Sequence, residues 1–170
     1  MAAGNTYIPI ATQTLGSSSA TVTFSSISAT YTDLVLIISA NQTVGNNDVW
    51  LQFNSDTASN YSNTQISGNG TSAASTRASS QTKLYIDNNA TMPTAASTFG
   101  NQIINIMNYS NTTTYKTVLS RSNNAAAATE AFVSLWRATP AAITTILIGL
   151  TGASNFTTGS TFSLYGILGA

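Results

Sequence analysis

The sequence contains neither cysteine nor histidine among its 170 residues. The absence of cysteine excludes disulfide bonds, thiolate nucleophiles and cysteine-ligated zinc. The absence of histidine excludes Ser-His-Asp and Cys-His triads, histidine metal sites and the proton transfer that imidazole provides near neutral pH. Most of the common enzyme active sites therefore cannot be built from this sequence.

Charge is the next scarce property, because only 6% of the residues are charged and five acidic residues balance five basic ones. An average globular protein carries about 25% charged residues. The basic residues are scattered singly along the chain, and without a clustered basic patch nucleic acid is excluded as the main partner. The chain is nevertheless 42% hydrophobic and 9% aromatic, which favours a folded domain over disorder.

A long hydrophobic run is also missing. The longest apolar stretch, residues 141–150, is interrupted by Thr144 and Thr145 and is shorter than the roughly 20 residues that cross a bilayer as a helix. Residues 1–5 carry neither the positive charge nor the apolar run of a secretory signal peptide. The sequence therefore predicts no membrane partner and no Sec export, and it predicts a buried strand at 141–150.

Serine, threonine and asparagine dominate the polar residues, whereas the Lys, Glu and Gln that favour helices are few. Threonine and the β-branched aliphatic residues suit pleated sheets, and Asn, Ser and Gly supply turns. The composition therefore predicts an all-β protein, an antiparallel jelly-roll-like β-sandwich of about ten short strands. The expected strands are 7–11, 20–27, 33–40, 49–53, 82–86, 101–109, 115–121, 131–137, 143–150 and 161–167.

The expected organisation is an N-terminal arm, residues 1–12, followed by a single sandwich domain, residues 13–170. Strands 33–40 and 49–53 are expected to form a hairpin across the turn at 45–48. Residues 54–80 form the longest stretch without strand periodicity, and a loop of this length is either a surface that contacts a partner or a plain excursion. The four alanines at 125–128 fit one helical turn or a loop equally well.

The five carboxylates, Asp33, Asp48, Asp56, Asp87 and Glu130, are the remaining candidates for acid–base chemistry. A glycosidase needs two carboxylates that face each other across the scissile bond. A sandwich could bring Asp48 to Asp56, or Asp87 to Glu130, but their spacing gives no support for either pair. Three of them stand beside Asn or Ser, where Asp commonly bonds turn backbone, so structural roles are favoured and no catalytic residue is predicted.

Two loop clusters offer oxygen ligands for calcium, namely 54–56 with Asn60, and 87–89. Neither matches an EF-hand loop, so plain turns are favoured and no metal or other cofactor is predicted. Trp50 and Trp136 fall within expected strands, where core packing is the commoner role. Tyr61 falls in the long loop and is the best candidate for stacking on a sugar ring.

Three motifs occur in a fixed order along the chain: YTDLVL at 31–36, VWLQFNSD at 49–56 with NYS at 60–62, and NFTTGSTFSLYGI at 155–167. Together they span most of the sequence. In this order they resemble motifs of small β-sandwich virion proteins of tailed bacteriophages. The resemblance implies a non-enzymatic structural role, as a capsid decoration (cement) protein or as part of a fibre or tail tip.

The surface composition agrees with permanent packing between many copies, since few charges and few lysines leave little side-chain entropy and little solvation to lose on contact. We therefore expect a homo-oligomer, with a trimer implied by the resemblance, located in the virion after synthesis in the host cytoplasm. The favoured partner is the major capsid protein, contacted through the N-terminal arm. The candidate contact residues are Tyr7, Ile8, Pro9, Ile10 and Tyr61.

Two alternatives remain open. A tail or fibre protein would present the long loop and its tyrosines to a host glycan. A carbohydrate-binding module or a glycan hydrolase would use the same sandwich outside phage biology, and the hydrolase would require a close pair of carboxylates. The lack of coiled-coil heptads or shaft repeats favours decoration over an extended tail part.

Overall fold

The computed structural model describes residues 6–88, 90–94 and 98–168, and in this part of the chain it contains twelve strands and no helix. The strands are β1 (Tyr7–Thr14), β2 (Thr21–Phe24), β3 (Asp33–Ala40), β4 (Val49–Phe53), β5 (Tyr61–Gly68), β6 (Ala73–Gln81), β7 (Leu84–Tyr85), β8 (Gly100–Ile106), β9 (Lys116–Asn124), β10 (Ala128–Trp136), β11 (Ile146–Leu150) and β12 (Thr161–Ile167).

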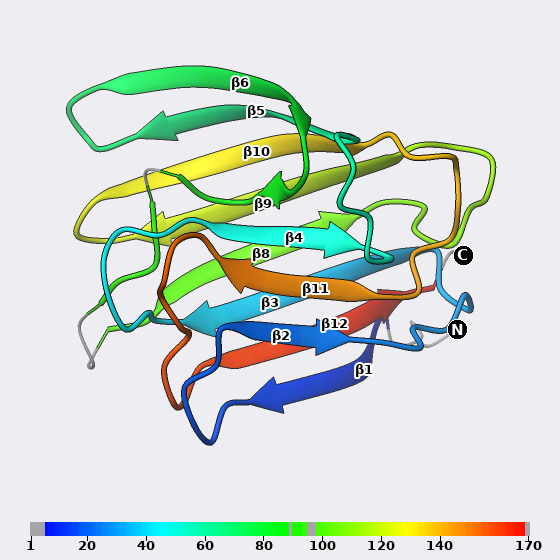
Figure 1. Cartoon of the computed structure of the whole chain (residues 1–170), viewed down its shortest axis with the longest axis horizontal. Coiled ribbons are helices and arrows are strands. Elements are labelled where there is room, and N and C mark those ends of the chain that lie inside the picture. The colour runs from blue at the N-terminus through cyan, green and yellow to red at the C-terminus, as the bar shows by residue number, and fades with distance from the viewer. Residues whose placement is uncertain (1–5, 89, 95–97, 169–170) are drawn as a thin grey trace.

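The strands form two antiparallel sheets that pack face to face (Figure 1). The large sheet has the order β1-β12-β3-β8-β9-β10-β5-β6, and the small sheet has the order β2-β11-β4-β7. The predicted all-β sandwich is therefore confirmed. The large sheet is twice as wide in strands as the small one, so β5 and β6 extend beyond the small sheet at one side (Figure 1).

The strand pairing is nested along the chain. β3 pairs with β12, β4 pairs with β11 and β5 pairs with β10, so that successive strands from the first half meet strands from the second half in reverse order. A jelly roll wraps a long folded-over chain in this manner. The nesting places the local meander β8-β9-β10 in the middle of the large sheet.

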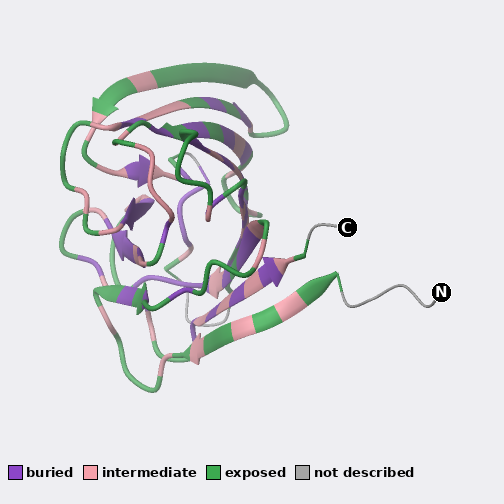
Figure 2. Ribbon diagram, turned by 90° about the vertical axis from the view of Figure 1, so that its right-hand side faces the viewer, coloured by how far each residue is buried: buried purple, intermediate pink, exposed green. Residues whose placement is uncertain are grey.

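The core lies between the two sheets and follows from the alternation of side chains along each strand. In β3 the inward residues Leu34, Leu36 and Ile38 are completely buried. On the facing small sheet, Leu51 and Phe53 of β4 close the same core. Figure 2 shows the alternation of buried and exposed residues along the strands of the large sheet.

The expected hairpin between 33–40 and 49–53 is wrong, although both strands form. β3 lies in the large sheet between β12 and β8, whereas β4 lies in the small sheet between β11 and β7. Consecutive strands that carry a continuous apolar run each need a buried position, and crossing from one sheet to the other supplies two such positions.

The expected loop at 54–80 is also wrong, because it holds the hairpin β5–β6. Asn69 closes the turn, since its Oδ1 accepts hydrogen bonds from the backbone N–H of Thr71 and Ser72 at 3.0 and 2.8 Å. β6 is the outer edge of the large sheet and is exposed on both faces, as the uppermost strand in Figure 2 shows.

Residues 7–12 of the expected arm lie within β1, which pairs with β12 as the other edge of the large sheet. Residues 1–5 lie outside the described residues. The alanines at 125–127 form a turn rather than a helix, and β10 begins at Ala128. Other boundaries differ by a few residues: the expected strand 82–86 shortens to β7, and 20–27 shortens to β2.

Candidate functional site

The outer face of the large sheet carries an unusual number of apolar side chains. Backbone register aligns five residues in one row across five strands, because Ile37 lies opposite Ile103, Arg121 lies opposite both Ile103 and Ala131, and Ala131 lies opposite Ile66. Ile66 is 63% exposed and Val133, in the adjacent row, is 53% exposed. We call the following residues the outer-face patch: Ile37, Ile66, Ile103, Leu119, Arg121, Ala131, Val133 and Leu135.

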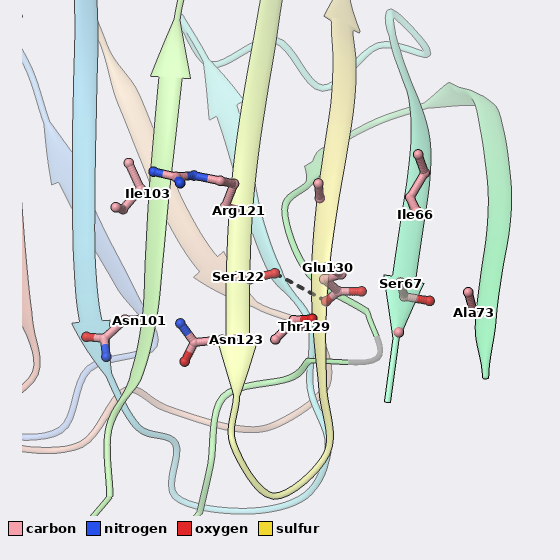
Figure 3. A pocket seen from close by; sticks show the side chains of 12 residues that line it. Ile66, Ser67, Ala73, Asn101, Ile103, Arg121, Ser122, Asn123, Thr129 and Glu130 are labelled. Carbon is pink, nitrogen blue, oxygen red and sulfur yellow. Dashed lines mark hydrogen bonds between the residues drawn. The ribbon is translucent and has the colours of Figure 1, made fainter. Parts of the chain in front are cut away.

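Arg121 is the charged member of the outer-face patch. Figure 3 shows its side chain extending from β9 toward Ile103 on β8, above a hollow of about 620 Å³. Within the part of the chain that the structure describes, no carboxylate forms an ion pair with Arg121. An exposed guanidinium among aliphatic side chains is the composition of a protein interface, where Arg is enriched and Lys is depleted.

The carboxylates do not neutralise this face because hydrogen bonds hold most of them elsewhere. Asp33 accepts the backbone N–H of Asn108 at 2.6 Å, at the beginning of β3. Asp56 accepts the indole Nε1–H of Trp136 at 2.7 Å and the amide of Asn60 at 2.9 Å. These acids stabilise turns and core side chains, as the sequence predicted.

Asp87 is completely buried between the sheets. Its two oxygens accept the backbone N–H of Val49 and the amide of Gln102, each at 2.5 Å. Burial raises the pKa of Asp87 well above the usual 3.8, and the neighbouring charges of Asp48 and Glu130 raise it further.

Glu130 is the second buried carboxylate and lies on the inner side of β10. Its Oε1 accepts the backbone N–H of Asn88 and of Ala90 at 2.7 and 2.9 Å, and its Oε2 accepts the amide of Gln65 at 2.6 Å. Glu130 therefore anchors the segment after β7 to the middle of the large sheet, which is a structural role.

The structure thus brings Asp87 and Glu130 into one electrostatic cluster, and Asp48 joins them. Asp48 is half-buried, and burial, together with the charge of Glu130, raises its pKa to about 6. The other pair weighed from the sequence, Asp48 with Asp56, is not brought together by any contact found in the structure. Within the described residues, no group of acids has the arrangement of a metal site.

The two candidate calcium loops have other partners. The carboxylate of Asp56 is occupied by Trp136, Asn60 and the backbone N–H of Ala58. Asp87 faces the core rather than solvent, and residue 89 lies outside the described residues. The turn predicted at 54–56 is present, whereas Asp87 of the second cluster lies in the core and not in a turn.

The contact residues predicted in the arm lie along β1. Tyr7 is 54% exposed and its ring meets the ring of Tyr165 edge-on, with centroids 6.2 Å apart. Pro9 is exposed, Ile8 is half-buried, and Ile10 packs against the core. Only Tyr7 and Pro9 of this group therefore present much of their surface to a partner.

Tyr61 is misplaced by the sequence interpretation. It is the first residue of β5, its side chain is completely buried, and its hydroxyl accepts the backbone N–H of Phe53 and donates to the carbonyl of Asp56, both at 3.1 Å. The ring fills the core beside Phe53, so it is not displayed for stacking on a sugar. Trp50 and Trp136 are also buried, as expected.

The outer-face patch was missed by the sequence interpretation. A signal was present, because the pairs Val118–Leu119 and Phe132–Val133 place apolar side chains on both faces of β9 and β10. In a half-exposed antiparallel strand one of each pair should be polar. A strand that is apolar on both sides, in a sheet with only one covered face, indicates a surface that another molecule covers.

No helix long and apolar enough to cross a membrane occurs in the described residues. Comparison with known proteins gives no relative from which a role can be transferred, since the chain matches no protein-family model and no curated protein sequence.

Proposed function

We propose that this protein is a non-enzymatic structural protein of a tailed-phage virion, in which it decorates the outer capsid lattice as a homo-oligomer. The observation that supports a docking role best is the outer-face patch, an apolar surface that includes an arginine without an ion pair in the described structure. The assignment to a virion rests on the resemblance of the three motifs in the sequence. The favoured location is the capsid surface, reached after synthesis in the host cytoplasm.

A structural role is supported by the use of the carboxylates. A hydrolase needs two carboxyl groups that face a substrate, whereas Asp87 and Glu130 are buried and hydrogen-bonded to backbone amides and glutamines. Their chemistry is therefore committed to holding β7 and the following segment against the large sheet.

The partner on the outer-face patch is expected to supply carboxylates within an apolar surface. Docking would remove water from the exposed Arg121, so the partner has to supply an anionic group, and four of this chain's five acids are already hydrogen-bonded within the fold. A second copy docking face to face on this patch would bring Arg121 close to its own symmetry mate. The major capsid protein is therefore the favoured occupant of this face.

Homo-oligomerisation is expected through a different surface, the free edge of β6. This nine-residue strand is exposed on both faces, and Arg77 is its only charged residue. Such an edge pairs readily with another strand unless something covers it. We therefore propose that β6 is buried in the oligomer, for which the resemblance favours a trimer.

The test is immunogold electron microscopy of virions produced by the genome that encodes this chain, combined with binding of purified protein to virions that lack it. Label spread over the head, with saturable binding, is the expected result. Label confined to the tail contradicts decoration, and the absence of label contradicts the virion assignment altogether.

Two matched variants test whether the capsid protein binds the outer-face patch or another part of the surface. Val133→Asp places a carboxylate in the patch, whereas Val44→Asp makes the same change at a residue of equal exposure, 55% against 53%, in the loop after β3. We expect at least about a tenfold loss of capsid affinity for the first variant and wild-type binding for the second. Equal affinities for the two variants contradict docking through the patch.

A further inference from the structure

A second hollow, of about 390 Å³, lies on the inner side of the large sheet, between β7 and the hairpin β5–β6. The small sheet ends at β7, whereas the large sheet continues through β5 and β6 (Figure 1). Five of its lining residues enter the argument that follows, and we call the site the β7 cleft: Asp48, Asn63, Tyr85, Asn88 and Phe132.

Four polar side chains in the β7 cleft have unused hydrogen-bonding capacity. The carboxylate of Asp48, the amides of Asn63 and Asn88, and the hydroxyl of Tyr85 make no hydrogen bond within the described part of the chain. Asp48 differs in this respect from the other four carboxylates, each of which accepts at least one hydrogen bond: Asp33, Asp56, Asp87 and Glu130.

On the side formed by β10, the wall of the cleft is closed and offers a ligand almost no surface. Phe132 is almost completely buried and forms part of the lining. Two residues further along the same face, Ser134 lies opposite Asn63 in the β10–β5 pair, and its buried hydroxyl has no hydrogen-bond partner in the described structure. Ser134 is 1% exposed and does not line the cleft, so its hydroxyl is closed off from a ligand bound there.

The chemistry of the β7 cleft suits a sugar. Each sugar hydroxyl both donates and accepts a hydrogen bond, and the cleft supplies a carboxylate acceptor, two amides and a phenol. Its volume is at the small end of the roughly 300–1,000 Å³ typical of ligand pockets, which suits one or two rings.

The negative charge of the cleft determines which class of sugar it can bind. Asp48 lines the cleft, and in addition to the effect of burial, charge repulsion couples it to groups nearby: the charge of Glu130 raises the pKa of Asp48, and the charge of Asp48 raises the pKa of Tyr85 and of Asp87. Arg77 also lines the cleft, but its register opposite Thr64 turns its side chain toward the other face of β6. Anionic sugars are therefore disfavoured.

We propose that the β7 cleft binds a neutral saccharide, with Asp48 accepting hydrogen bonds from its hydroxyls and with Asn63, Tyr85 and Asn88 completing the contacts. This site is separate from the outer-face patch and does not depend on docking to a capsid. On a virion it would give the particle an affinity for glycans while the opposite face of the large sheet remains bound to the shell.

The experiment is isothermal titration of the full-length protein with glucose, galactose, mannose, N-acetylglucosamine and their β-linked disaccharides, followed by the same titrations on three variants. Asp48→Asn removes the charge and keeps the shape, and Tyr85→Phe removes one hydroxyl. Tyr115→Phe is the matched control, because Tyr115 is 59% exposed and lies outside the cleft. Circular dichroism melting of each variant verifies that it folds.

The expected result is saturable binding of at least one of these sugars, weakened about tenfold by Asp48→Asn and severalfold by Tyr85→Phe, and unchanged by Tyr115→Phe. The proposal is overturned if none of the sugars binds at tens of millimolar. It is also overturned if both cleft variants bind as the wild type does, or if EDTA abolishes binding, since a bridging cation would then be the ligand. Capsid binding is measured separately, so failure of one proposal leaves the other intact.

Discussion

Trp136 donates the N–H of its indole ring to the Asp56 carboxylate over 2.7 Å, and this bond joins the end of β10 to the turn before β5. The same carboxylate accepts the amide of Asn60 and the backbone N–H of Ala58. The Asp56 side chain therefore fixes a turn and orients a core tryptophan, while the backbone carbonyl of Asp56 accepts the hydroxyl of Tyr61, the first residue of β5.

Asp56→Ala should lower the free energy of unfolding by about 2–3 kcal/mol, because the buried indole N–H loses its acceptor together with two further bonds. Urea denaturation measures the change. Asp56→Asn keeps one carbonyl acceptor and is expected to lose less than half as much. A loss below about 0.5 kcal/mol in Asp56→Ala contradicts a stabilising role for this hydrogen-bond network.

Asp87→Asn should change how stability depends on pH. Burial raises the pKa of Asp87 in the folded protein, so the folded state binds this proton more tightly than the unfolded chain does. The stabilisation is complete below about pH 4 and is lost as the pH rises through the folded pKa. The variant cannot titrate at this position, so its stability relative to the wild type should increase from acidic to neutral pH.

Local hydrogen bonding also favours Asp87→Asn at neutral pH. The Oε1 of Gln102 is buried without a partner, and the amide introduced by the substitution can donate to it once the Gln102 amide rotates. Urea unfolding of both proteins at several pH values between about 4 and 8 measures the difference. A difference that does not vary with pH contradicts the raised pKa.

The pKa of Asp56 is shifted in the opposite direction to that of Asp87, so Asp56 gives stability the opposite dependence on pH. Partial burial raises its pKa, but hydrogen bonds from Asn60, Trp136 and Ala58 outweigh that effect and the net pKa is lowered from 3.8. Its stabilisation is present above about pH 4 and is lost as the pH falls further. The wild-type protein should therefore be most stable in mildly acidic solution, which thermal melting across the pH range measures.

Gly149→Ala should destabilise the small sheet. A Cβ at this position would lie 2.3 Å from Cζ2 and 2.8 Å from Cε2 of the buried Trp50 ring, which has little room to move. We expect a loss of about 1–3 kcal/mol from overpacking. Gly16→Ala is the control, since a Cβ there meets nothing within 4 Å, and equal stability of the two variants in urea contradicts the steric argument.

If residues 1–12 formed a separate arm, as the sequence predicts, deletion of residues 2–10 would leave the sandwich intact. The structure alters that expectation, because the deletion removes half of β1 and exposes the edge of β12. Ile10 packs against the core, so we expect a lower melting temperature together with any loss of capsid binding. Tyr7→Ala, at an exposed residue, tests binding without this loss, and an unchanged melting temperature of the deletion contradicts the pairing.

The sequence predicted most strands because their inward residues are apolar, as Leu34, Leu36 and Ile38 are in β3. It missed β5 and β6 because the inward residues of β5 include Gln65 and Ser67, and β6 is exposed on both faces. The Asn69-Gly70 turn was the available hairpin signal. Without alternating apolar residues on either side, this turn signal does not distinguish a hairpin from a loop.

Neither candidate site could be located from the sequence, because both depend on pairing between distant strands. The outer-face patch exists only when β3, β8, β9, β10 and β5 lie side by side. Asp48 and Glu130 become neighbours because β4 and β10 face each other across the sandwich. The sequence offers Asp87 with Glu130 as one of two possible carboxylate pairs, but no feature of the neighbouring residues indicates that the two lie close together.

The nested pairing also constrains how the chain folds during synthesis. Of the twelve described strands, β12 leaves the ribosome after the other eleven, and it lies between β1 and β3, which leave much earlier. Until it emerges, β1 has no partner and the inward row of β3 lacks a neighbour on one side. Such long-range closure is slow and leaves open strand edges for the whole of translation. Chains truncated before β12 should therefore depend on chaperones or be degraded.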